Sequence, residues 1–269
     1  MMMTETNDQA APGYVLRSGF GFKTVWVLES LPDGEYRTGK ELYDGILLPR
    51  HRRDPGLLVE FVDVADREGL FRSLEQIRST LASTGQVPLI HFETHGNEQG
   101  LGLKSREFVC YEELCPVLRE INILSQDNLF VVVAACQGSY LAFMLKDSLT
   151  DPCPFWGICG PSVEITAGDV IAGYSAFYEE ALVSADMNKA LTCLKKAIPH
   201  HADKFNIWNS EYLFLIAFRH YLRDHCNEEA IEKRAQMIIT EAELGLGGPI
   251  DTAKYGDYIR QRLGTEDGQ

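Results

Sequence analysis

The sequence predicts an α/β fold, an α/β/α sandwich in which helices cover both faces of a mostly parallel central sheet. Short apolar segments alternate with amphipathic segments along most of the 269 residues, which is typical of successive βαβ units. Runs such as Phe130–Val133 are apolar throughout, as expected for central parallel strands buried on both faces. A composition of 45% hydrophobic and 24% charged residues suits one large or two small globular domains.

The alternation begins near residue 24. The β-branched and aromatic segment Thr24–Ser30 predicts a strand, and the turn-forming LPDGEY sequence ends it. Thr38 and Glu41 have the spacing of a capping box, so we expect a helix to begin there. Leu57–Val64 predicts a second strand. Apolar residues recur at helical spacing within Asp66–Ser83, which predicts an amphipathic helix.

The middle of the chain continues the same pattern. Val87–Phe92 predicts a third strand and Asn128–Cys136 a fourth. Between them Tyr111–Leu124 predicts a helix, although Pro116 falls early within it. A further helix is expected over Leu141–Leu149.

The last strand and the closing helices complete the prediction. Pro154–Gly160 predicts a fifth strand, and Thr166 with Asp169 marks the start of the next helix. Met187–Ile198 continues with more helix. Two closing helices are expected at the C-terminal end, the first of which has a sequence that also suits a strand; they span Asn209–Cys226 and Glu228–Gly245.

Charge and cysteine content exclude several classes of protein. The net charge of −14 disfavours nucleic-acid binding, which normally needs a basic surface. Neither a long apolar run nor an apolar signal region is present, so we expect a cytoplasmic protein without membrane contact. Seven cysteines without a CxxC motif argue against a zinc site or a disulfide framework. His200 and His201 lack accompanying ligands at suitable spacing, so we predict a loop and no metal.

A histidine and a cysteine follow two of the expected strands and form the candidate site. His95 and Cys136 each come just past a strand end, and parallel strands place such residues at one edge of the sheet if they are neighbours. Histidine accepts the thiol proton and later protonates the leaving amine, and the thiolate is the nucleophile. Gly96 lets its backbone N–H approach an oxyanion, and the Cys136 N–H is a plausible second donor.

These segments resemble caspase-type cysteine proteases. That family places histidine before cysteine and has the nucleophile signature Q-A-C-[RQG]-G. Ala134–Gly138 has the sequence AACQG, and Leu89–Gly96 has the sequence LIHFETHG. The second matches the apolar-His-apolar-x-x-His-Gly pattern of the CHAT-domain branch. The segment Phe155–Leu191 resembles the strand and helix that follow the nucleophile in that branch. The resemblance covers about residues 85–200.

The resemblance implies roles for individual residues. Cys136 would be the nucleophile, His95 the acid and base, and Gly96 an oxyanion contributor. His91 would support the site from outside it. Glu93 departs from the small residue common in the family; it would orient a histidine, recognise a basic substrate or face solvent, and we favour solvent. The polar N-terminal sequence predicts a disordered arm (1–12), and the resemblance implies a caspase-like peptidase domain (13–205). The closing helical segments predict a C-terminal helical extension packed on that domain (206–269).

The function implied by the resemblance is a cysteine endopeptidase that needs no cofactor. Its substrate would be a protein. Because an unrestrained protease would be harmful to the cell, we expect that a regulatory protein partner, a ligand or a cleavage activates it by ordering the loops around the site. The family suggests a role in prokaryotic antiviral defence or programmed cell death. Two alternatives stay open: a non-catalytic caspase-like scaffold that binds partners, and a Cys–His amidase or acyltransferase with the same dyad.

Overall fold

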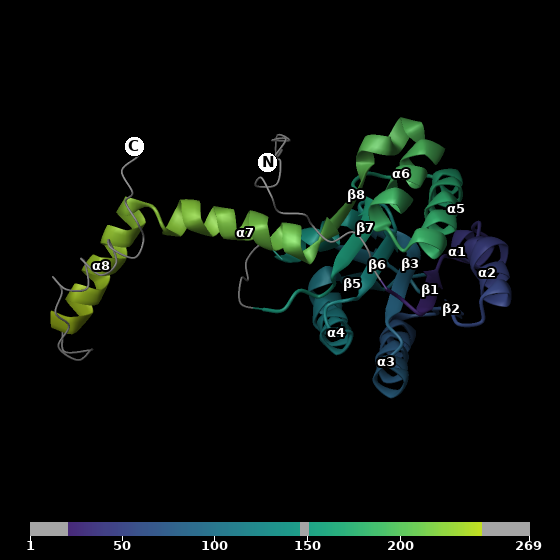
Figure 1. Cartoon of the computed structure of the whole chain (residues 1–269), viewed down its shortest axis with the longest axis horizontal. Coiled ribbons are helices and arrows are strands. Elements are labelled where there is room, and N and C mark those ends of the chain that lie inside the picture. Colours follow the sequence, from purple (N-terminus) through teal and green to yellow (C-terminus); the bar gives the residue numbers. More distant parts are fainter. Residues whose placement is uncertain (1–20, 146–150, 244–269) are drawn as a thin grey trace. The chain divides into compact units, whose positions relative to one another are not determined.

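The computed structural model describes residues 21–145 and 151–243, which contain a central sheet with helices on both faces (Figure 1). The strand order is β2-β1-β3-β6-β7-β8, and β4 pairs with both β3 and β5. The strands are β1 Thr24–Ser30, β2 Leu58–Asp63, β3 Pro88–Asn97, β4 Gly100–Gly102, β5 Phe108–Cys110, β6 Phe130–Ala134, β7 Gly157–Pro161 and β8 Phe205–Asn209. Neighbours in this order are parallel except β7 and β8. The predicted fold class is confirmed.

Helices connect the strands. They are α1 Thr38–Leu42, the π-helical turn η1 Tyr43–Leu47, α2 Leu48–Arg53, α3 Arg67–Thr84, α4 Tyr111–Leu124, the 3₁₀ segment η2 Gly138–Leu145, α5 Ala167–Ser184, α6 Met187–Ala197, the 3₁₀ segment η3 Pro199–Lys204, α7 Ser210–His225 and α8 Glu228–Glu243. The helix expected over 141–149 is a 3₁₀ segment instead, and its last predicted residues lie outside the described residues.

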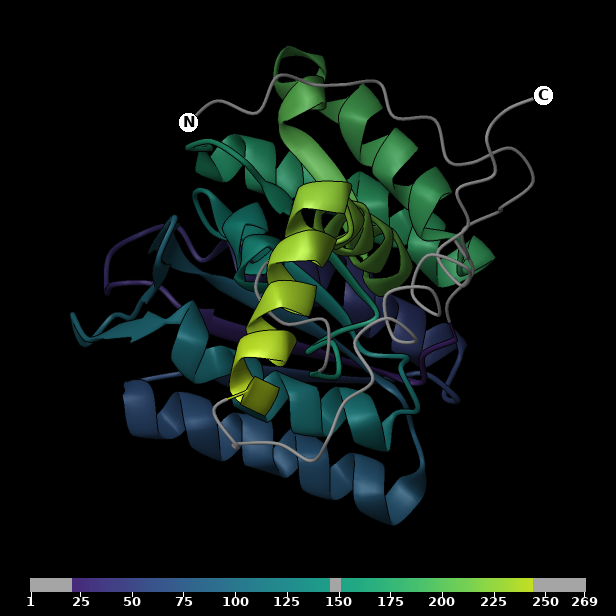
Figure 2. The same ribbon diagram turned by 90° about the vertical axis from the view of Figure 1, so that its left-hand side faces the viewer.

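Alternate residues of the strands face two separate apolar layers. In β1, Trp26 and Leu28 pack with buried residues of α3 and α4, whereas Val25 and Val27 pack with those of α1, α5 and α6. The same alternation holds in β6, because successive side chains of a strand point to opposite faces. Figure 2 shows α3 and α4 side by side along one face of the sheet. The α/β/α layering follows from two-sided burial of the strands.

Two of the predicted helix starts have different outcomes. At α5, the Thr166 side chain accepts from the Asp169 N–H and the Asp169 carboxylate accepts from the Thr166 N–H, so this capping box is confirmed. At α1 the expected helix does begin at Thr38, but the capping box is wrong, because Arg37 is the N-cap residue and Thr38 is the first residue of the helix. The Thr38 hydroxyl hydrogen-bonds Glu93 instead of capping its own helix.

Strand β3 is longer than its apolar core predicts. It continues through His95 and Gly96 to Asn97, where those residues pair with β4 in an antiparallel ladder. The Asn97 side chain accepts hydrogen bonds from the N–H groups of Gln99 and Gly100, which closes the turn between β3 and β4. His95 therefore lies within a strand, beyond its parallel part, and the expectation that it follows the strand end is corrected.

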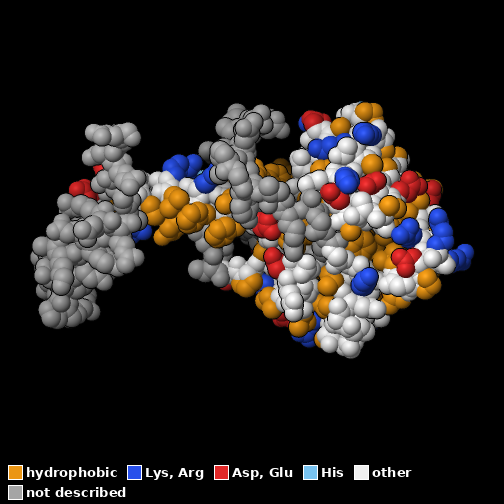
Figure 3. Space-filling model, viewed as in Figure 1, with side chains coloured by type: hydrophobic (Ala, Val, Ile, Leu, Met, Phe, Trp, Pro, Cys, Tyr) orange, Lys and Arg blue, Asp and Glu red, His pale blue; other side chains and the backbone are white. Residues whose placement is uncertain are grey.

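The sheet also extends further towards the C-terminus than expected. Phe205–Asn209 forms β8 against β7, so a boundary after residue 205 would cut this strand. The chain divides into two compact units after Phe214. The second unit contains the rest of α7 and α8, and Figure 3 shows apolar side chains gathered along α7. Phe218 and Leu222 are exposed apolar residues of this helix. Residues 1–12, predicted to form an arm, lie outside the described residues.

Within the described ranges 21–145 and 151–243, every helix is too short or too polar to cross a membrane.

Candidate active site

The strands that carry the predicted histidine and cysteine are neighbours. β3 and β6 pair in parallel, and the last pair of their register joins Glu93 to Ala134. His95 and Cys136 each lie two positions beyond this pair. Parallel strands with this register bring both residues to the same edge of the sheet, as the sequence predicted for neighbouring strands.

A single pocket contains both side chains. It has a volume of about 200 Å³, and its lining includes His95, Cys136, Glu35, Glu93, Ile165 and Val170. The lining comes from the ends of β3 and β6, the turn after β1 and the start of α5. The arrangement therefore places an imidazole, a thiol and carboxylates around one small cavity.

Glu35 orients the exposed histidine. His95 Nε2 lies 2.8 Å from Glu35 Oε2, and both side chains are about half exposed. Glu35 lies in the turn after β1, where its N–H donates to the Pro32 carbonyl. A carboxylate that accepts from one ring nitrogen fixes the tautomer and leaves the other nitrogen to act as a base. The LPDGEY sequence indicates only a turn in this segment, so the contact of Glu35 with His95 is not predicted by the sequence.

The cysteine lies at a tight bend after β6. The Cys136 Sγ lies 4.0 Å from the Ile165 carbonyl oxygen. Gln137 has a φ of 58°, a left-handed conformation, and its N–H donates to the Val163 carbonyl. A Cβ on Gly138 would lie 2.5 Å from the Val133 carbonyl oxygen, so glycine is required for this bend. The bend turns the chain sharply away from the sheet immediately after the thiol.

Gly96 allows close contact between the two strand ends. A Cβ at this position would lie 2.9 Å from the Ala135 Cβ and 3.2 Å from the Cys136 carbonyl oxygen. Any side chain here would therefore push the histidine strand away from the cysteine. The structure gives this glycine a packing reason, whereas a role of its N–H towards an oxyanion stays a prediction.

A second histidine of β3 is buried with its partners. His91 is 0% exposed, and its ring contacts the Tyr178 hydroxyl at Nδ1 and the Glu93 carboxyl at Nε2, both at 3.0 Å. Its ring also packs edge-on against Tyr174. The solvent-facing interpretation of Glu93 is wrong, because this side chain is buried and orients a histidine. Burial raises the pKa of Glu93 above its ordinary value, and the His91 contact opposes this rise.

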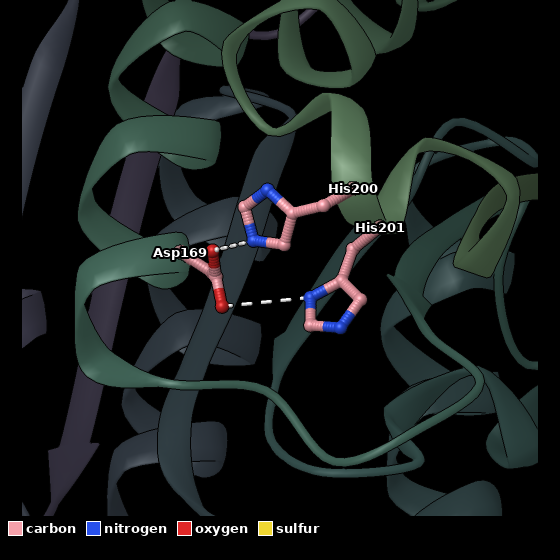
Figure 4. A group of neighbouring side chains, drawn as sticks. All are labelled: Asp169, His200 and His201. Atoms are coloured by element: carbon pink, nitrogen blue, oxygen red, sulfur yellow. Dashed lines mark hydrogen bonds and ion pairs between the residues drawn. The ribbon is translucent and has the colours of Figure 1, made fainter.

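The predicted loop at His200 and His201 is a 3₁₀ segment that meets a carboxylate. Asp169 of α5 lies close to both imidazoles (Figure 4). One ligand atom of each residue lies within 4.8 Å of the others. The sequence showed no carboxylate at metal-ligand spacing because Asp169 comes from a separate helix. The earlier interpretation is corrected on this point.

Comparison with known proteins identifies no family. No model of a known protein family matches the chain, and no curated protein matches it significantly.

Proposed function

We propose that this protein is a caspase-like cysteine endopeptidase of the CHAT type. The observation that carries the proposal is the shared pocket of His95 and Cys136 at the ends of the adjacent parallel strands β3 and β6. Sequence resemblance in LIHFETHG and AACQG supports the same assignment. Neither histidine nor cysteine alone carries it, because a lone cysteine or a lone His-Gly pair is common in inert structure.

The reaction uses the two residues in turn. His95 takes the thiol proton of Cys136, and the resulting thiolate attacks the carbonyl carbon of the scissile amide. The tetrahedral oxyanion collapses, the C–N bond breaks, and the imidazolium gives its proton to the leaving amine. A thioester to Cys136 remains. Water, deprotonated by His95, then attacks the thioester and releases the acid and the free thiol.

Glu35 supports both proton transfers in this scheme. Its carboxylate accepts the hydrogen bond from His95 Nε2, so the opposite ring nitrogen serves the thiol. The negative charge also stabilises the imidazolium that forms after the first transfer. The thiol thereby acts as the nucleophile and the imidazole as the base, and the carboxylate orients the imidazole.

The size of the pocket favours regulation. About 200 Å³ is smaller than the roughly 300–1,000 Å³ typical of ligand pockets, and a peptide needs an extended groove. We infer that a protein partner widens the site before a protein substrate binds in the cytoplasm. The resemblance supports a role in prokaryotic antiviral defence or programmed cell death. The chemistry requires no cofactor.

The same pocket size favours one alternative. A small amide would fit the present cavity without rearrangement, which makes a Cys–His amidase or acyltransferase the second candidate. A non-catalytic scaffold has no need for a thiol beside an oriented imidazole, and reaction of Cys136 with an electrophilic peptide separates that possibility from both enzymes.

The test is proteome-wide mapping of new N-termini produced by the wild type and by Cys136→Ala. We expect cleavage sites in the wild type that are absent from the variant. Cys193→Ala, which removes a partly exposed thiol of α6, is the matched control and should cleave as the wild type does. Identical N-termini from wild type and Cys136→Ala would end the protease proposal. Labelling of Cys136 without any new N-terminus would favour the amidase.

A further inference from the structure

Two consecutive histidines and one aspartate meet at the start of α5, outside the pocket lining. His200 Nε2 lies 2.7 Å from Asp169 Oδ1, and His201 Nδ1 lies 3.5 Å from Asp169 Oδ2. Figure 4 shows both rings turned towards the two carboxylate oxygens. Imidazole and carboxylate are the ligand types that zinc sites combine, so the cluster invites a metal interpretation.

The Asp169 carboxylate is held in position by its neighbours, as expected of a metal ligand. Asp169 is 7% exposed, and its Oδ2 accepts a 2.8 Å hydrogen bond from the Thr166 hydroxyl. Burial alone would raise the pKa of Asp169, but the hydrogen bonds from Thr166 and the contact with His200 lower it below its ordinary value. Metal-binding carboxylates are held in this way by hydrogen bonds from neighbouring residues. The capping box of α5 thus also fixes an ionised carboxylate towards the histidines.

His201 supplies the second, independent observation. Its Nδ1 is buried and makes no hydrogen bond within the described residues, because the 3.5 Å contact with Asp169 lacks hydrogen-bond geometry. This nitrogen faces the Asp169 carboxylate without a hydrogen bond, and the His201 side chain is 29% exposed. A cation between the ring and the carboxylate would accept its lone pair and bridge the two groups.

The distances suit a small ion. Bonds of about 2.0–2.1 Å in a tetrahedral site separate neighbouring ligand atoms by about 3.3 Å. The two observed separations, 2.7 Å and 3.5 Å, lie on either side of that value. All three ligand atoms lie within 4.8 Å of one another, so shifts of about 1–2 Å would complete the site. The His200 side chain is 62% exposed, which gives an ion a path from solvent.

We propose that Asp169, His200 and His201 bind one divalent transition-metal ion, for which Zn²⁺ is the best match. Two imidazoles favour Zn²⁺ over Mg²⁺ and Ca²⁺, which prefer oxygen ligands. Three protein ligands leave the fourth position to water. The ion joins the start of α5 to η3. Ala167 and Val170 of α5 line the Cys136 pocket, so the ion also holds one wall of that pocket in place.

The site is tested on the full chain after treatment with a chelator, with ZnCl₂ titrated and followed by calorimetry and thermal unfolding. We expect one Zn²⁺ per chain and a rise in Tm of about 5 °C or more at about 100 times the dissociation constant. CoCl₂ serves as a spectroscopic probe. Nitrogen and oxygen ligands give d–d bands without a thiolate charge-transfer band, which distinguishes this cluster from the cysteines.

Substitutions test whether Zn²⁺ binds at the cluster of Asp169, His200 and His201 or elsewhere on the chain. His200→Ala and His201→Ala should each weaken Zn²⁺ binding at least about tenfold, whereas the exposed α7 histidine variant His220→Ala and the pocket variant Cys136→Ala should bind as the wild type does. Asp169→Asn also disturbs the α5 capping box. If that variant does not fold, the two histidine variants provide the test. The absence of Zn²⁺-dependent stabilisation, or equal affinity in a His200→Ala/His201→Ala double variant, overturns the proposal. The protease proposal is unaffected by either result.

Discussion

Strand β3 carries two histidines, each paired with a glutamate, and the two pairs differ mainly in their surroundings. His91 contacts Glu93 at 3.0 Å with side-chain exposures of 0% and 3%, whereas His95 contacts Glu35 at 2.8 Å with exposures of 56% and 46%. The histidines lie four positions apart and both use Nε2. The contact geometry is nearly the same, so distance and residue type do not distinguish the buried pair from the pair that we propose to be catalytic.

The surroundings of the second ring nitrogen, Nδ1, distinguish His91 from His95. In His91, Nδ1 contacts the Tyr178 hydroxyl, so both nitrogens have buried protein partners and the ring has no path to a substrate. His95 reaches the pocket that contains Cys136. A histidine can act as a base only where a ring nitrogen is free to reach the proton that it takes. The comparison predicts that changes at His95 alter rates, and that changes at His91 alter stability.

The largest effect is expected for His95→Ala. Removal of the base should lower the rate at which an electrophilic peptide labels Cys136 by about 10³-fold, because general acid–base catalysis contributes about 10²–10⁴. Thermal unfolding should stay within about 2 °C of the wild type, since the side chain is half exposed. His220→Ala is the matched control, because it removes an exposed histidine of α7. Unchanged labelling of Cys136 in His95→Ala would remove the functional half of the comparison.

The next effect is expected for His91→Ala. The free energy of unfolding should fall by about 3 kcal/mol, because Glu93 and the Tyr178 hydroxyl lose their partner while they stay buried. Urea denaturation measures this loss. The double variant His91→Ala/Glu93→Gln should recover part of it, since it removes the unpaired acid. A loss below 1 kcal/mol with an unchanged m-value would show that the buried pair is dispensable.

The rate of Cys136 labelling per folded molecule distinguishes His91→Ala from His95→Ala. We expect His91→Ala to label at nearly the wild-type rate at a temperature where it is folded. A loss of labelling as large as that of His95→Ala would place His91 in the reaction and contradict the division between the two pairs.

The sequence predicted the parts of the site that depend on strand pattern. Buried strands ending near His95 and Cys136 indicated one sheet edge, and the pairing of β3 with β6 confirms their adjacency. Glu35 and Asp169 were missed, because they reach their histidine partners over 60 and 31 positions of chain that no local pattern links. Glu93 was misassigned because a charged residue near a strand end normally faces water.

The fold shows the same limit. The 18-residue helix α3 carries enough apolar residues at helical spacing to be predicted, and β6 is recognised by its uninterrupted apolar run. The three-residue strands β4 and β5 are too short for any period, although they pair with the end of β3 that carries His95. Strand β8 follows a 3₁₀ segment and runs directly into α7, so its five residues are not separated from the helix by a turn signal.

The smallest effect is expected for Glu35→Gln, which probes the exposed pair without removing the base. The amide keeps the size of the side chain and its oxygen still accepts from His95 Nε2, but the negative charge that stabilises the imidazolium is lost. The exposed position lets water replace part of that stabilisation, so the labelling rate of Cys136 should fall only about tenfold. Glu41→Gln, an exposed carboxylate of α1, is the control and should label at the wild-type rate. A loss equal to that of His95→Ala would mean that the carboxylate is indispensable to the base. No loss at all would mean that the 2.8 Å contact is a surface ion pair without a role in orientation, and that exposure alone distinguishes His95 from His91.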